Sequence, residues 1–427
     1  MKVLVVGGGG REHALAWRIR QSPRVREILI APGNGGTALE PGMRNVPIAA
    51  IDIDGLLELA QSERVDLTII GPEAPLSLGI VDRFIAAGLR CFGPTRAAAQ
   101  LESSKAFTKH FLARHAIPSA AYAVFTELDS ALAYVRERGA PIVIKADGLA
   151  AGKGVVVAMH LKEAEAALSD MLGGGGSLGV AGSRVVVEDF LEGEEASYIV
   201  IADGHRYLAM ATSQDHKRRD RGDLGPNTGG MGAYSPAPVV TAQIDDLVRR
   251  TVIEPTLAGM RHAGTPFVGF LYAGLMIDPL GAIKVLEFNV RLGDPETQPI
   301  MLRLRSDLVD LIEAALDRRI GEVDCRWDPR PAVGVVLAAE GYPDTARKGD
   351  TVGGLSVTQM PEVKVFHAAT RLSDGHVITD GGRVLTVCAI AKDLSLARAL
   401  AYQRADSISW PGMFYRDDIG SRGVGRG

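Results

Sequence analysis

The sequence predicts an α/β protein, α+β over its whole length, with an open parallel sheet at its N-terminal end. From residue 1 to about residue 100, short β-branched runs at 3–6, 28–31, 67–71 and 90–93 alternate with helix-like stretches. Turns rich in glycine and proline follow these runs, for example at 7–10. Parallel strands joined by crossover helices produce this alternation, and ligands bind at the edge of the sheet where such turns meet. One edge of this region is therefore expected to face a substrate.

The remaining elements follow from hydrophobic periodicity. A helix is expected around 107–112, strands at 142–145, 155–157 and 184–188, and a mobile glycine loop at 173–176. Further on, strands are expected at 197–202, 271–277 and 283–290, followed by a single helix over 300–318. The last part should contain strands at 333–338 and 384–391, a helix near 396–408 and a frayed tail at 420–427. The chain thus divides into at least an N-terminal piece, a mixed middle piece and a strand-rich end.

Composition limits the possible partners. Of the 427 residues, 46% are hydrophobic and 23% charged, which suits a globular protein of two to four domains. The 47 basic and 51 acidic residues give a net charge of −4, so neither nucleic acid nor a membrane surface is an expected partner. The three cysteines and the absence of a leader at the first residues predict a cytoplasmic protein. A monomer is expected, because the sequence shows no heptad pattern.

The first candidate for a binding site is the glycine turn before the first expected helix. Gly9, Gly10 and Arg11 lie where backbone amides and the helix dipole can bind a phosphate. The spacing does not match the dinucleotide fingerprint, because Glu12 or His13 occupies its last glycine position. The alternative is a tight turn with only a structural role. The local sequence favours the two interpretations about equally.

The second candidate is the loop between the strands at 142–145 and 155–157. Lys145 ends the first strand, and the loop contains Gly148, Gly152, Lys153 and Gly154. The spacing is not that of a P-loop. A glycine-rich loop can still fold over a triphosphate while a strand-borne lysine binds phosphate oxygens. The alternative, an exposed hairpin, would leave a lysine unpaired among apolar residues.

The third candidate is a strand face. Period-two alternation places Glu287, Asn289 and Arg291 on one side of the strand at 283–290. A carboxylate and an amide oxygen two residues apart suit Mg²⁺, which also takes phosphate oxygens as ligands. A solvated strand face is the alternative.

The fourth candidate is a polar stretch that contains Asp215 and Lys217 and leads to a turn beginning at Asn227. The turn, Asn-Thr-Gly-Gly-Met-Gly, exposes much backbone to a ligand. The charge run at 218–223 is expected to be a solvated loop. The nine histidines show no zinc-ligand spacing.

Six strings in this order resemble the phosphoribosylamine–glycine ligase family of the ATP-grasp superfamily, from residue 1 to about 420. They are Gly-Gly-Arg-Glu-His (9–13), Ala-Pro-Gly-Asn (31–34), Gly-Pro-Glu-Ala-Pro-Leu (71–76), Ile-Lys-Ala-Asp-Gly-Leu-Ala-Ala-Gly-Lys-Gly-Val (144–155), Asn-Thr-Gly-Gly-Met-Gly-Ala-Tyr-Ser-Pro (227–236) and Gly-Asp-Pro-Glu-Thr-Gln (293–298). The resemblance implies an N-terminal α/β substrate domain (1–103), an ATP-grasp domain (104–325) with a mobile lid at about 120–190, and a C-terminal domain (326–427).

The resemblance also implies roles for individual residues. For ATP it implies Lys105, Lys145, Gly148, Gly152, Lys153, Gly154, Glu188, Phe190, Leu191 and Glu195, with 188–191 as the adenine hinge and Glu195 on the ribose. For phosphoribosylamine and glycine it implies Gly9, Gly10, Arg11, Asp215, Lys217, Asn227, Arg291 and Asp294, with Lys145, Arg291 and Asp294 as the catalytic residues. Glu287 and Asn289 would bind Mg²⁺ or Mn²⁺. The preceding strand, 273–277, lacks the additional metal carboxylate of many superfamily members.

The implied reaction joins glycine to 5-phosphoribosylamine at the expense of ATP, through glycyl phosphate, in purine nucleotide synthesis. Two other classes of function stay open at this point. The strand–glycine–helix unit at the N-terminal end is also compatible with a dinucleotide-dependent oxidoreductase. An ATP fold that has lost turnover would act as a nucleotide-sensing module, although Lys145, Glu287 and Asn289 argue against that.

Overall fold

The computed structural model describes residues 1–149, 154–173, 183–356 and 360–426. Its N-terminal part is a five-stranded sheet in the order β3-β2-β1-β4-β5, in which every pairing is parallel. The strands are β1 (Lys2–Gly7), β2 (Glu27–Pro32), β3 (Met43–Asn45), β4 (Leu67–Ile70) and β5 (Cys91–Phe92). The helices are α1 (Gly10–Arg20), α2 (Ile53–Ser62), α3 (Glu73–Leu78), α4 (Ile80–Ala86) and α5 (Gln100–Ser103). The predicted parallel α/β region is therefore confirmed.

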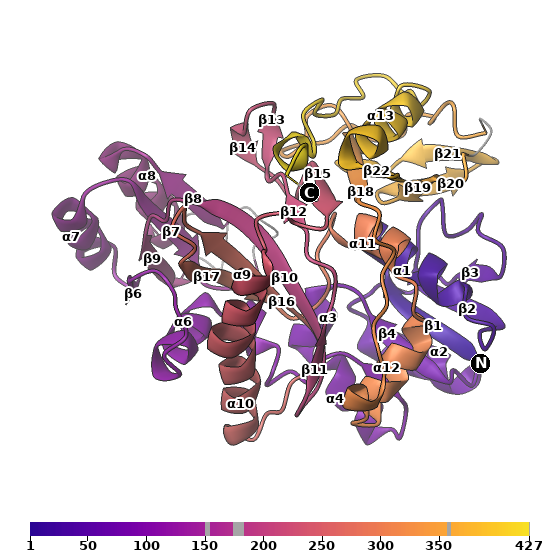
Figure 1. Ribbon diagram of the computed structural model, residues 1–427, viewed down its shortest axis with the longest axis horizontal. Helices are drawn as coiled ribbons and strands as arrows, with labels where there is room; N and C mark the ends of the chain where they lie inside the picture. Colours follow the sequence, from indigo (N-terminus) through magenta and orange to yellow (C-terminus); the bar gives the residue numbers. More distant parts are fainter. Residues whose placement is uncertain (150–153, 174–182, 357–359, 427) are drawn as a thin grey trace.

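A central antiparallel sheet in the order β11-β10-β16-β17 follows (Figure 1). Its strands are β10 (Glu194–Asp203), β11 (Tyr207–Ala209), β16 (Val268–Ile277) and β17 (Ile283–Asn289). The helices of this part are α6 (Lys105–Arg114), α9 (Ala242–Val248), the π-helical turn η2 (Arg249–Ile253) and α10 (Glu254–His262). The last eight residues of β10 are all buried, which places this strand in the core between layers.

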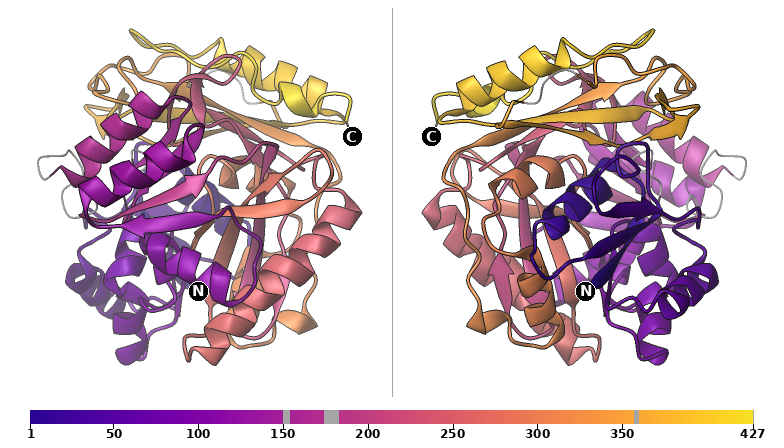
Figure 2. Two further views of the ribbon diagram at one scale, coloured as in Figure 1. Left: turned by 90° about the vertical axis from the view of Figure 1, so that its left-hand side faces the viewer. Right: turned by 90° about the vertical axis from the view of Figure 1, so that its right-hand side faces the viewer.

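A small sheet in the order β6-β9-β7-β8 stands apart from the central one (Figures 1 and 2). It consists of β6 (Tyr122–Phe125), β9 (Val185–Asp189), β7 (Ile142–Ala146) and β8 (Val155–Ala158), with helices α7 (Leu128–Arg138) and α8 (Leu161–Leu172). Its buried residues, among them Val135, Ile144, Leu168 and Val187, form a core of their own. The residues assigned to a lid, about 120–190, contain this unit; that it moves stays a prediction. The predicted glycine loop at 173–176 lies, after Gly173, outside the described residues.

The fourth sheet joins strands from distant parts of the sequence, in the order β12-β15-β18-β22-β19. Its strands are β12 (Gln214–Asp215), β15 (Gly232–Ser235), β18 (Ala332–Ala338), β22 (Arg383–Ile390) and β19 (Val363–His367), and α13 (Leu394–Ala405) packs on it. Smaller elements are the hairpins β13 (Arg218–Asp220)–β14 (Leu224–Asn227) and β20 (Thr370–Ser373)–β21 (His376–Thr379), and the 3₁₀ turns η3 (Ile320–Glu322) and η4 (Ser421–Gly423). Because β15 pairs with β18, this sheet crosses the expected division at 325/326. Figure 2 shows it lying above the N-terminal sheet.

Two expectations about elements were wrong. The single helix over 300–318 is two helices, α11 (Thr297–Arg303) and α12 (Leu308–Leu316). Leu304 leaves the helix to form a bridge with Trp327, and Asp307 begins the second helix by accepting a hydrogen bond from the Val309 amide. The run at 218–223, expected to be a solvated loop, begins instead as strand β13 of a hairpin; only its second half, 221–223, is the exposed turn that was expected.

The expected fraying of the tail was also wrong for its described residues. Arg422 pairs with Asp223, Arg426 pairs with Glu194, and Ile419 just before them is fully buried. Among the described residues, no helix combines the length and the apolar character needed to span a bilayer.

Candidate functional site

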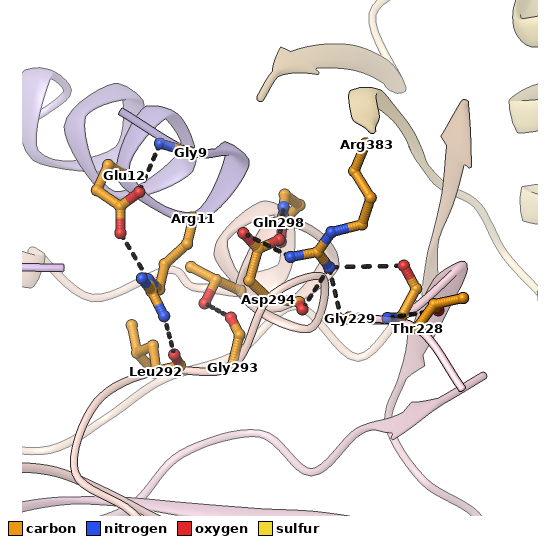
Figure 3. A network of polar contacts seen from close by, with 12 residues as sticks. Gly9, Arg11, Glu12, Thr228, Gly229, Leu292, Gly293, Asp294, Gln298 and Arg383 are labelled. Atoms are coloured by element: carbon orange, nitrogen blue, oxygen red, sulfur yellow. Dashed lines mark hydrogen bonds and ion pairs between the residues drawn. The ribbon is translucent and has the colours of Figure 1, made fainter. Parts of the chain in front are cut away.

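One backbone amide of the glycine turn at the start of α1 is already hydrogen-bonded to a side chain of the same helix. The Gly9 amide donates to Glu12 Oε2 at 2.7 Å, and the other oxygen of Glu12 accepts from Arg11 Nε at 2.6 Å. Arg11 also donates to the Leu292 carbonyl at 3.2 Å and is only 7% exposed (Figure 3). Arg11 therefore joins α1 to the segment after β17. A Cβ on Gly10 would lie 2.5 Å from Gln298 Nε2, so a larger residue there would have to displace the Gln298 side chain.

Two buried lysines share one carboxylate beneath the small sheet. Lys145 Nζ lies 2.9 Å from Glu188 Oε1 and donates to the Leu286 carbonyl at 3.0 Å. Lys109 Nζ, from α6, lies 2.7 Å from Glu188 Oε2. Burial lowers the pKa of Lys109 to about 8 although Glu188 opposes this shift. In this structure the Glu188 side chain is thus the counter-ion of two lysines, while Phe190 and Leu191 follow β9 as half-buried residues.

Lys105 lies at the glycine-rich loop. Its Nζ donates to the Gly148 carbonyl at 2.9 Å, and burial lowers its pKa. Gly154 accepts a hydrogen bond from the Ala146 amide at the other end of the loop. Gly152 and Lys153 lie outside the described residues. A cavity of about 500 Å³ adjoins this region and is lined by Ser77, Arg96, Gln100, Ser103 and Leu149.

Glu287 lies within reach of three lysine charges. Burial alone would raise its pKa, but Lys217, Lys145 and Lys105 lower it. Lys217 Nζ is 4.0 Å from Glu287 Oε1 and 2.7 Å from Glu195 Oε2. The structure therefore brings Lys145 and Glu287, which are 142 positions apart in sequence, into one electrostatic cluster.

Further acids surround Lys217. Burial raises the pKa of Asp215 to about 7; Lys217 opposes this shift, and Glu296 and Glu195 add to it. Thr228 links the following turn to the same place, since its amide and its hydroxyl both donate to the Lys217 carbonyl. Asn227, at the end of β14, pairs with Arg218 in the hairpin and is half-buried.

Arg291 is held by carboxylates from the N-terminal part. Its Nη2 lies 2.8 Å from Glu102 Oε1 and 3.2 Å from Asn289 Oδ1, and its Nε lies 3.3 Å from Glu73 Oε2. Burial raises the pKa of Glu102 to about 7, and Arg291 opposes this shift. The guanidinium thus bridges the carboxyl edge of the parallel sheet and the end of β17.

Asp294 lies opposite the glycine turn. A Cβ on Gly9 would be 3.4 Å from Asp294 Oδ2. Gln298 Nε2 donates to its Oδ1 at 2.8 Å, and Arg383 Nη2 lies 3.5 Å from its Oδ2 (Figure 3). A cavity of about 290 Å³ opens here, lined by Gly8, Gly9, Asp294, Tyr342, Ala368, Ala369 and Arg383.

Several residues of this region were absent from the sequence analysis as site residues. They are Glu73, Glu102, Lys109, Glu296, Tyr342 and Arg383. Glu73 and Glu296 belong to strings that were singled out, so each offered a signal. The others stand in unremarkable local sequence, and tertiary packing alone brings them to the site.

Two oxygen ligands of the site suit a hard divalent cation, although they do not complete its coordination. Glu287 offers an ionised carboxylate and Asn289 an amide oxygen, both of which suit Mg²⁺. Within the described residues, no group of three or more His, Cys, Asp or Glu side chains forms a complete metal cage. Such a pair is sufficient where phosphate oxygens and water complete the coordination.

Lysines of the small antiparallel sheet, of α6 and of the segment after β12 gather around Glu188 and Glu287, beside the central antiparallel sheet. With the family match below, this arrangement defines the class of the protein: an ATP-grasp enzyme. Family models of phosphoribosylglycinamide synthetase match its N domain at residues 1–102, its ATP-grasp (A) domain at 103–297 and its C domain at 332–422. The chain belongs to this phosphoribosylglycinamide synthetase family.

Individual relatives agree with the family. The phosphoribosylamine–glycine ligase of Allochromatium vinosum is 61% identical over 426 residues, covering 100% of this chain and 99% of the relative. That of Xanthomonas campestris is 62% identical over 427 residues, with 100% and 99% covered. The crystal structure of phosphoribosylamine–glycine ligase from Thermotoga maritima superposes with a TM-score of 0.82 at 33% identity, covering 98% of this chain and 100% of that one. A Campylobacter jejuni biotin carboxylase in complex with a nucleotide (TM-score 0.73, 14% identity, 96% and 92% covered) shares the fold.

Proposed function

We infer that this protein is an ATP-dependent carbon–nitrogen ligase that joins glycine to 5-phosphoribosylamine and forms glycinamide ribonucleotide, ADP and phosphate in purine nucleotide synthesis. The family and the full-length identity to phosphoribosylamine–glycine ligases support this function. The structural observation that carries it is the convergence of Lys105, Lys145 and Lys217 on the ionised Glu287. Such a group of charges suits a triphosphate and its cation.

We propose the following chemistry. A carboxylate oxygen of glycine attacks the γ-phosphorus of ATP, so that ADP leaves and glycyl phosphate forms. The amine nitrogen of phosphoribosylamine then attacks the glycyl carbonyl carbon, loses a proton and expels phosphate. Lys105 and Lys145 would stabilise the negative charge on the transferred group. The glycine-rich loop would exclude water from the acyl phosphate.

The other assignments are proposals on the same basis. Glu287 and Asn289 would hold Mg²⁺ or Mn²⁺, which neutralises phosphate charge when bound. Glycines 148, 152 and 154, with Lys153, would cover the phosphates, 188–191 would border the adenine and Glu195 the ribose. The acceptor side would consist of Gly9, Gly10, Arg11, Asp215, Lys217, Asn227, Arg291 and Asp294. Because Arg11 and Glu188 are already paired, their roles would be to support neighbouring groups.

We propose a cytoplasmic location on the basis of the cysteines. Cys91 and Cys388 are buried and Cys325 is half-buried, and all three are free thiols. Free thiols fit the reducing cytoplasm that the sequence predicts.

The deciding experiment measures ADP release with each substrate omitted in turn. The expected result is release that requires glycine, phosphoribosylamine and a divalent metal together. Glu287→Gln should lower metal-dependent turnover at least ~10²-fold, or about 3 kcal/mol, because it removes a negative ligand. Glu254→Gln, an exposed glutamate of α10, is the matched control. Near-normal turnover of Glu287→Gln would exclude the metal role.

A further inference from the structure

Arg383, the first residue of β22, extends from the C-terminal sheet to two turns of the site. Its Nη1 donates to the Gly229 carbonyl at 2.6 Å and to the Asp294 carbonyl at 2.6 Å. Its Nη2 lies 3.5 Å from Asp294 Oδ2. Figure 3 shows the guanidinium between the two turns, on the opposite side of Asp294 from Arg11. One side chain thus connects three separate stretches of the chain.

The two turns also pack directly against each other. Gly230 has φ +111°, and a Cβ there would lie 2.4 Å from Pro295 Cδ. A Cβ on Gly229 would lie 3.0 Å from Arg383 Cζ. The close approach therefore requires glycine at Gly230, and the turn has little room to shift without moving Pro295 or Arg383.

A second side chain from the C-terminal part holds the same turn. Tyr342 accepts a hydrogen bond from the Gly229 amide on its hydroxyl oxygen at 2.9 Å. The Gly230 amide donates to Thr228 Oγ1 at 3.0 Å, and that hydroxyl donates to the Lys217 carbonyl. The turn is therefore fixed on one side by the C-terminal part and on the other by the segment between β12 and β13, which carries the proposed substrate residue Lys217.

The charge of Arg383 acts on Asp294. Burial alone would raise the pKa of Asp294, but Arg383 first, and Arg11 and Gln298 after it, lower it. Nη1 already donates to the Gly229 and Asp294 carbonyls, with the Gly230 carbonyl at 3.5 Å, and Nη2 faces the carboxylate. The guanidinium is therefore placed to act through its neighbours, since these donors are committed before any ligand arrives.

We propose that Arg383 is a positioning residue for the acceptor side of the site: it sets Asp294 and the Thr228–Gly230 turn for the ribosyl phosphate substrate. The inference rests on the proposed function, in which Asp294 and Asn227 contact the acceptor. The 290 Å³ cavity beside Asp294 is far larger than glycine needs, so phosphoribosylamine is the substrate whose binding depends on Arg383. The proposed ATP lysines, Lys105 and Lys145, contact Gly148, Glu188 and Leu286 and not the Thr228–Gly230 turn, so ATP binding should not depend on Arg383.

The test compares Arg383→Met and Arg383→Lys with the natural protein. Calorimetry measures the Kd of glycinamide ribonucleotide, a stable product that carries the ribosyl phosphate, and steady-state assays give the KM of ATP and of glycine. Arg383→Met should raise the product Kd at least ~10-fold and leave both KM values within about twofold. Arg383→Lys keeps the charge and should recover part of the affinity. Arg371→Met, at an exposed arginine of β20, is the control.

Hydrogen–deuterium exchange over 228–232 gives a readout that does not depend on the proposed function. Exchange there should be faster in Arg383→Met and unchanged in Arg371→Met. An unchanged product Kd, unchanged exchange, or an equal loss of ATP and product affinity would overturn the proposal. If circular dichroism shows that Arg383→Met is unfolded, the product Kd and the exchange of Arg383→Lys are compared with those of the natural protein instead. Failure of the natural protein to ligate glycine would refute the function instead, and exchange would still decide whether Arg383 holds the turn.

Discussion

At the scale of single residues, Glu188 carries one negative charge between two buried lysines. Its side chain is 3% exposed, as is that of Lys109, and that of Lys145 is 8% exposed. A buried carboxylate needs a full counter-charge. If Lys145 alone supplied it, little positive charge would remain for a nucleotide. Because Lys109 shares this role, part of the charge of Lys145 is left for phosphate.

Lys109→Met is therefore expected to raise the KM for ATP at least ~10-fold, because Glu188 would then neutralise Lys145. Steady-state kinetics at saturating glycine and phosphoribosylamine measure the effect. Lys109→Arg should stay close to the natural protein. Lys162→Met, at an exposed position of α8, should have no effect.

The same lysine predicts a pH dependence. The pKa of Lys109 is lowered by burial to about 8, so its charge is present below that pH and lost above it. The KM for ATP should rise as the pH increases through about 8, and this rise should be absent in Lys109→Arg. A flat profile in the natural protein would contradict the counter-ion role.

At the scale of elements, Asp307 separates two helices where the periodicity suggested one. Its Oδ1 accepts from the Val309 amide at 2.9 Å, and its Oδ2 accepts from Ser22 Oγ at 2.6 Å. Asp307→Ala removes both bonds and should lower the free energy of unfolding by about 1–2 kcal/mol. Urea unfolding followed by circular dichroism measures it.

Two variants serve as controls for this prediction. Asp307→Asn can still cap the helix and should lose less stability than the alanine variant. Asp310→Ala removes only an exposed pair with Arg24, so its effect should be well below that of Asp307→Ala. Equal losses at the two positions would show that the cap does not stabilise α12.

At the scale of the whole molecule, the N-terminal sheet and the C-terminal sheet are joined by a buried polar contact. Glu40 pairs with Lys364 of β19 and lies 3.2 Å from His13 Nε2. His13 Nδ1 accepts from the His367 amide, and Asn34 Nδ2 donates to the His367 carbonyl. A shared apolar core that includes Val3, Ile300 and Phe366 continues this contact.

This contact predicts acid sensitivity. Burial would raise the pKa of Glu40, but His13 and Lys364 outweigh it and lower the pKa from 4.5 to about 2. A lowered folded-state pKa means stability that is fully present above about pH 4.5 and lost as the pH falls towards 2. Glu40→Gln should lower the Tm at pH 7 and weaken the dependence of Tm on pH in that window. Glu58→Gln, an exposed glutamate of α2, should change neither.

Much of the molecule follows from its sequence. Period-two and helical patterns placed β1, β2, β4, β7, β9, β10 and β22 within one or two residues in most cases, because local propensity and burial agree there. The strings around Lys145 and Glu287 indicated a nucleotide and a cation before any coordinates, since lysine, glycine and oxygen ligands have few other uses in that pattern.

Only the tertiary structure decided how these parts meet. Local periodicity cannot detect the bridge from Leu304 to Trp327 that interrupts a helix, nor the pairing of β15 with β18 across an expected boundary. It also cannot show that Glu188 faces Lys109 or that Arg383 lies at Asp294, 89 positions away. Counter-ions and packing partners are chosen by distance in space, and the order of residues along the chain constrains that distance only within one element.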